Sequence, residues 1–84
     1  LVDFTVSLQG VEIGMLFIEQ ARGGVKGSLR SRTGLDCAKL AAKVGGGGHR
    51  AAAGLTLSDP LPTAVERVLT LVREAIDSST VGAR

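Results

Sequence analysis

Apolar and polar residues alternate along the first third of the chain, and this alternation predicts two strands. The stretch 11–20 carries apolar residues on both sides, with Val11, Ile13, Met15 and Phe17 on one and Leu16 and Ile18 on the other. A strand that is apolar on both sides is expected in the interior of a sheet, covered on both faces. Glycines at 23 and 24 then mark a hairpin turn before the next strand.

The second strand, 25–32, separates its side chains by chemistry. One side carries Val25, Gly27, Leu29 and Ser31, and the other carries Lys26, Ser28, Arg30 and Arg32. Alternating polar residues are usually a solvated face. Three bases without an acid on one strand face are also typical of an anion-binding surface, and both interpretations stay open.

Helical spacing appears twice further along. Asp36 is expected to cap a helix whose apolar stripe consists of Cys37, Leu40, Ala41 and Val44. A short strand is predicted at 53–57, and a final helix opens at 59–62, where proline is tolerated in the first turn. The final helix has the clearest amphipathic pattern, with Leu61, Val65, Val68, Leu69, Val72 and Ile76 on one face. Residues 78–84 are predicted to form a frayed tail.

The first nine residues carry two conflicting patterns. Strict alternation from Val2 to Gln9 favours a strand, while Leu1, Phe4 and Leu8 permit two helical turns. Periodicity alone favours the strand.

Size and composition set limits on the class of protein. With 84 residues, 44% of them hydrophobic, the chain is a single domain (1–84) or part of one. No apolar run approaches the roughly 20 residues that span a bilayer, and no signal-peptide pattern is present. We therefore expect a soluble, cytoplasmic domain with no membrane partner. The single cysteine, Cys37, excludes an internal disulfide and lies among apolar neighbours, as a core thiol would.

The net charge of +2 is modest, but the bases are concentrated. The stretch between positions 22 and 50 has Asp36 as the acidic counterpart of a set of cations: Lys26, Arg30, Arg32, Lys39, Lys43 and Arg50. An anionic ligand would find one positive region there. The chain has two aromatic residues, both Phe, which argues against base recognition by aromatic stacking.

A run of four glycines is the most informative motif. Gly45, Gly46, Gly47 and Gly48 are followed directly by His49 and Arg50. Exposed backbone amides of such a loop can turn toward a phosphate, and the two side chains that follow are hydrogen-bond donors. Two purely structural roles compete with this one: a glycine can simply end a helix, and a lone histidine often serves as a structural hydrogen-bond partner. The phosphate-loop pattern of NTPases, which needs Gly-Lys-Ser or Gly-Lys-Thr, is absent.

Taken together, these motifs resemble the DHH-associated C-terminal domain, subfamily 1, of the DHH phosphoesterases, and within it the bacterial oligoribonuclease and pAp-phosphatase group. The matching segments are Gly-Val-Glu at 10–12, Ser-Leu-Arg-Ser at 28–31, Asp36, and Gly-Gly-Gly-Gly-His-Arg-Ala-Ala-Ala-Gly at 45–54. The resemblance places residues 1–9 at the end of a helix, and we follow it there over the periodicity. The expected fold is α/β: a small mixed β-sheet with two main helices packed on it, in the order strand, strand, helix, strand, helix after a short N-terminal helix.

The resemblance also implies a function. An upstream DHH catalytic domain would hold two manganese ions, while this chain, which by itself is expected to be inactive, would bind the substrate: short RNA, pAp or a linear dinucleotide. The implied substrate-binding residues are Ser28, Arg30, Arg32, Gly45, Gly46, Gly47, Gly48, His49 and Arg50. Two alternatives remain: a nucleic-acid-binding module like the one appended to alanyl-tRNA synthetase, and part of a RecJ-like exonuclease. If an upstream strand is missing, the open sheet edge favours a homodimer.

Overall fold

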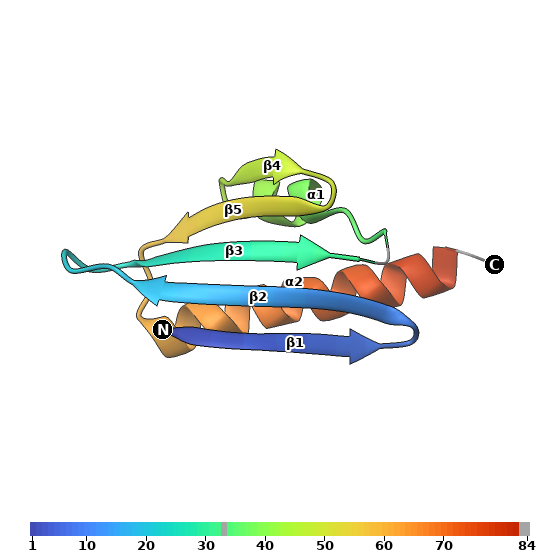
Figure 1. Ribbon diagram of the computed structural model, residues 1–84, viewed down its shortest axis with the longest axis horizontal. Coiled ribbons are helices and arrows are strands. Elements are labelled where there is room, and N and C mark those ends of the chain that lie inside the picture. Colours follow the sequence, from blue (N-terminus) through green and yellow to red (C-terminus); the bar gives the residue numbers. More distant parts are fainter. Residues whose placement is uncertain (33, 83–84) are drawn as a thin grey trace.

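A five-stranded sheet with two helices on one face forms the domain (Figure 1). The computed structural model describes residues 1–32 and 34–82, with the side chains of all of these except 4 and 79–82. The elements are β1 (Val2–Leu8), β2 (Val11–Glu19), β3 (Val25–Ser31), α1 (Cys37–Ala42), β4 (Gly47–His49), β5 (Ala52–Leu57) and α2 (Leu61–Gly82). The predicted α/β class and the two helices packed on a sheet are confirmed.

The sheet is antiparallel throughout, so the expectation of a mixed sheet was wrong. Its strands lie in the order β1-β2-β3-β5-β4, and each neighbouring pair runs in opposite directions. Hairpins explain three of the four pairings, because strands joined by a tight turn must be antiparallel. The remaining pair, β3 with β5, is connected through α1 and β4, which bring the chain back in the opposite direction.

The N-terminal segment is a strand and not the helix that the resemblance implied. Its register with β2 runs from Val2 opposite Phe17 to Leu8 opposite Val11. Between the strands, Gln9 and Gly10 both have positive φ, at 53° and 79°, as a two-residue hairpin turn requires. In this register the apolar residues of β1 lie opposite the buried residues of β2. The alternation of apolar and polar residues therefore predicted this segment correctly as a strand.

The two faces of the sheet differ completely in their surroundings. Both helices pack on the inner face, where Ile13, Met15 and Phe17 of β2 are buried (Figure 1). The opposite face, here called the outer face, is left uncovered by the described residues, and Ile18 is 40% exposed on it. The expectation that β2 is covered on both faces was therefore wrong. The predicted division of β3 is confirmed, because its apolar side is buried and Lys26, Ser28 and Arg30 are exposed.

The helices begin where the sequence predicted. The Asp36 carboxylate caps α1 by accepting a hydrogen bond from the Lys39 amide at 3.2 Å. The helix α2 buries Ala64, Val68, Val72 and Ile76 against the sheet, while Leu61, Val65 and Leu69 of the predicted apolar face are half-buried.

The final helix is longer than the pattern suggested, since its backbone stays helical to Gly82. The prediction of a frayed tail from 78 was wrong over 78–82, and its last two residues lie outside the described ones. Neither glycine nor proline occurs between 63 and 81, so nothing in that stretch ends the helix. No helix within 1–32 or 34–82 is long and apolar enough to cross a membrane.

Candidate substrate-binding face

The first two glycines of the run end the helix α1. Gly45 has a φ of 80°, and its amide donates to the Ala42 carbonyl at 3.2 Å. The Gly46 amide donates to the Ala41 carbonyl at 2.8 Å. These two bonds form a Schellman motif, which closes a helix with a residue in the left-handed conformation. The amide of Gly46, expected to face a phosphate, is thus engaged inside the fold.

The next part of the run forms β4, a strand that the sequence analysis missed. Gly47, Gly48 and His49 pair with Gly54, Ala53 and Ala52 of β5. The two strands approach so closely that a Cβ on Gly48 would lie 2.6 Å from the Ala53 Cα. Glycine is depleted in strands, so propensity gave no sign of this one. No turn signal marked the hairpin either, because Arg50 and Ala51, which connect His49 to Ala52, are not residues typical of a two-residue hairpin turn.

Strand registers bring Arg30 and His49 into one row across the outer face. His49 pairs with Ala52, Ala52 pairs with Arg30, and Arg30 pairs with Gly14. Adjacent strands lie about 4.8 Å apart, so the backbones of Arg30 and His49 are separated by about 10 Å with only the alanine methyl between them. This geometry lets one anionic group contact both side chains.

A second row of residues lies beside the first, and its side chains near β4 and β5 are even smaller. Gly47, Gly54, Ser28 and Leu16 follow one another across β4, β5, β3 and β2. A Cβ built on Gly47 would meet nothing within 4 Å, so the space above it is open. A cavity of about 280 Å³ extends from these rows toward β1 and is lined by Asp3, Gly14, Met15, Leu16, Ser28 and Arg30. The outer face therefore offers a shallow surface with donors at Ser28, Arg30 and His49.

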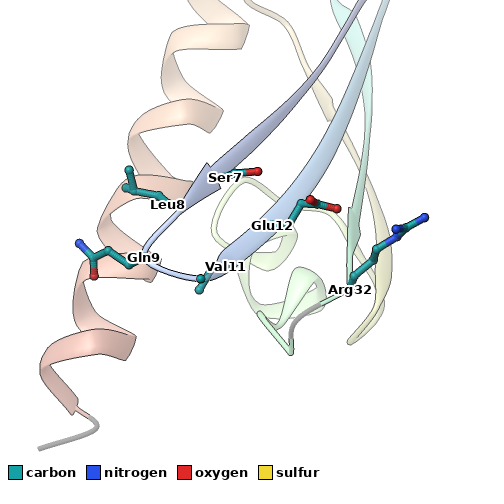
Figure 2. Close-up of a pocket in the computed structure, with 7 residues that line it drawn as sticks. Ser7, Leu8, Gln9, Val11, Glu12 and Arg32 are labelled. Atoms are coloured by element: carbon teal, nitrogen blue, oxygen red, sulfur yellow. The ribbon is translucent and has the colours of Figure 1, made fainter.

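Arg32 lies away from these rows, beyond the end of β3. It lines a larger cavity of about 510 Å³ at the β1–β2 hairpin, together with Ser7, Leu8, Gln9, Gly10, Val11 and Glu12. Figure 2 shows the side chains of Ser7, Glu12 and Arg32 pointing to the same side of the sheet. Glu12 lines this cavity as Asp3 lines the one beside Arg30, so each cavity contains a carboxylate, and only position separates Arg32 from the rows of Arg30 and His49.

Arg50 is directed toward the beginning of α1. Its guanidinium donates to the Gly34 carbonyl at 3.1 Å, and its own carbonyl accepts from the Cys37 amide at 2.8 Å. The β4–β5 turn is thereby tied to the segment that leads into α1.

Of the predicted site residues, the structure groups Ser28, Arg30, Gly47 and His49 on one surface and places Arg32, Gly45, Gly46 and Arg50 elsewhere. Gly48 is on the inner side of β4, opposite the buried Ala53.

The described residues do not fit a metal centre or a reactive nucleophile. Within 1–32 and 34–82, no group of three or more His, Cys, Asp or Glu side chains is placed to hold an ion. Cys37 is fully buried, and its burial, with a smaller effect of the Asp36 carboxylate, raises the pKa of its thiol. It is a core residue, as predicted. The manganese ions that the resemblance implied concern another domain and remain a prediction.

Residues 1–78 match the family model of the DHHA1 domain. The chain belongs to the DHHA1 domain family. It is also 44% identical over 77 residues to the bifunctional oligoribonuclease and PAP phosphatase NrnA of Thermus thermophilus. That alignment covers 88% of this chain and 24% of the relative, so the chain spans about a quarter of that protein. The DHHA1 assignment confirms the family to which the glycine, histidine and Ser-Leu-Arg-Ser motifs pointed.

Proposed function

We propose that this DHHA1 domain binds the substrate of a DHH-family phosphoesterase that hydrolyses short oligoribonucleotides, pAp or linear dinucleotides. The observation that carries the proposal is the row of Arg30, Ala52 and His49 on an uncovered sheet face. On that face β3, β4 and β5 carry no acidic residue. The name of the Thermus relative, an oligoribonuclease and PAP phosphatase, indicates the substrate class.

The side chains of the outer face suit a phosphate ester. The Arg30 guanidinium binds a phosphate through two parallel hydrogen bonds, and His49 donates to the same or the adjacent phosphate. The Ser28 hydroxyl and the open surface over Gly47 accommodate the sugar-phosphate backbone. The domain does not contact the bond that breaks; it supplies binding energy that positions the scissile phosphate in a manganese-containing DHH domain elsewhere in the longer protein.

Titration of the 84-residue chain with pApA, followed by NMR, tests this function. We expect shift changes centred on Arg30, His49 and Ser28, and weaker binding at higher salt. Arg30→Ala and His49→Ala should each weaken binding by roughly 1 to 3 kcal/mol, because each removes a charge-assisted hydrogen bond. Lys39→Ala is the matched control: this exposed lysine is on α1, away from the outer face.

During the same titration pApA should stay intact with or without manganese, since the described residues offer no metal site. Shifts that avoid Arg30 and His49 would contradict the site. Binding that favours long single strands strongly over pApA would support the RecJ-like or tRNA-synthetase-like alternatives instead.

We also propose that the domain self-associates through β1. This strand is at the end of the strand order, so one of its edges has no partner within the described part of the chain. Its seven residues contain neither lysine nor proline, the residues that commonly protect an edge. Light scattering at rising concentration should show a dimer, and a monomer at the highest concentration reached would contradict this arrangement.

A further inference from the structure

Along β3, the polar side chains of the outer face continue beyond the residues assigned to the first phosphate. Lys26, Ser28 and Arg30 are all exposed on the outer face at intervals of two residues. Two residues of a strand span about 6.6 Å, so the Lys26 backbone is about 13 Å from that of Arg30. Three hydrogen-bond donors thus follow one straight line in the centre of the sheet, and Lys26 has no role in the proposed phosphate site.

The neighbours of Lys26 are suited to a nucleotide. Across the strands, Lys26 pairs with Thr56 of β5 on one side and Ile18 of β2 on the other. Thr56 is exposed and adds a hydroxyl beside the ammonium group. Ile18 is 40% exposed and provides an aliphatic surface against which a base can lie.

The path between Lys26 and Arg30 is unobstructed. On β5 the outer-face positions along this path are Thr56, Gly54 and Ala52, all of them small. On β2 the corresponding positions are Ile18, Leu16 and Gly14. Single-strand-binding proteins follow the backbone with a positively charged line and stack the bases on aromatic side chains. Here the basic line is present, and the surface beside it is aliphatic, so the contacts to phosphate carry the binding.

We propose that Lys26 and Thr56 form a second phosphate subsite, which binds the phosphate two nucleotides away from the one at Arg30. This inference rests on the proposed function of the outer face. Ser28 contacts the intervening phosphate, and Ile18 lies under a base. Only an extended 5′-phosphorylated oligoribonucleotide of at least three nucleotides fills both subsites, because pApA, which fills the first, has too few phosphates to reach from Arg30 to Lys26.

Affinity measured against chain length tests the subsite. In the unaltered chain pApApA should bind roughly fivefold more tightly than pApA, a gain of the size expected from one exposed charge-assisted contact. Lys26→Ala should remove this gain and leave the affinity for pApA within about twofold. The slope of log affinity against log salt for pApApA should also become shallower by about 0.7, the value for one released counterion on a single strand.

Two further variants distinguish a phosphate subsite from a general effect of surface charge. Thr56→Val keeps the shape of β5 and should reduce affinity for pApApA while sparing pApA. Lys39→Ala removes an exposed lysine of α1 and should affect neither ligand. If Lys26→Ala affected both ligands equally, or neither of them, the second subsite would be overturned. The first subsite would still stand in that case, provided that Arg30→Ala strongly weakened binding. If Arg30→Ala also left pApA binding unchanged, the proposed function itself would fail.

Discussion

Replacing Gly46 by valine should strongly destabilise the domain. A Cβ at this position would overlap the Gly54 carbonyl and lie 2.9 Å from the Leu55 Cα. Both are backbone atoms of β5 and cannot rotate away. We expect a cost of at least roughly 3 kcal/mol, the upper part of the usual range for overpacking. For a domain of this size that corresponds to a fall of roughly 12 °C or more in Tm, measured by circular dichroism.

Gly47→Val, at the next residue and the first of β4, is the matched control. A Cβ there meets nothing within 4 Å, so Tm should change by no more than a few degrees. The new side chain would lie beside Gly54 on the outer face. It should weaken pApA binding roughly tenfold, because it would fill the open space in which the ligand is proposed to bind. If both variants unfolded alike, β4 would not lie beside β5 in this register; if Gly47→Val bound pApA normally, the ligand would not occupy the surface over Gly47.

Val72→Asp should unfold the domain. Val72 is fully buried where α2 packs on the sheet, and an unpaired carboxylate there loses its hydration without gaining a partner. The penalty of several kcal/mol is comparable to the whole stability of a small domain, on the order of 5 kcal/mol. Thr70→Asp, at an exposed position of the same helix, should leave the melting curve nearly unchanged. Equal melting temperatures for the two variants would show that α2 does not pack through Val72.

Side-chain alternation and helical spacing predicted most elements because each strand and helix has one buried side. The division of β3 into a buried and an exposed side followed directly from the order of its residues. The same pattern could not reveal that both helices pack on one side of the sheet, so the apolar Leu16 and Ile18 suggested a second covering layer that residues 1–32 and 34–82 do not form. At residues 1–9 the local alternation was correct, and the family resemblance led to the wrong helix.

The candidate site was predictable in its residue types and not in its arrangement. Charge and the glycine run identified Arg30 and His49, which are 19 positions apart in the sequence. Their common row depends on the register of β3, β5 and β4, and register depends on turns that sequence alone does not specify. The helix-ending role of Gly45 and Gly46 depends on hydrogen bonds to Ala41 and Ala42, which only the folded chain shows.

Because both helices pack on one face of the sheet, the residues that stabilise the fold and the residues proposed to bind a ligand lie on opposite faces of the same strands. Along β3 and β5 each residue that contributes to the core alternates with an exposed residue of the outer face. Outer-face positions such as Leu16, Ser28 and Thr56 can therefore vary without repacking the interior. A library that randomises these three positions should yield mostly folded proteins, and screening it with short RNA would test whether the outer face sets the proposed nucleotide preference.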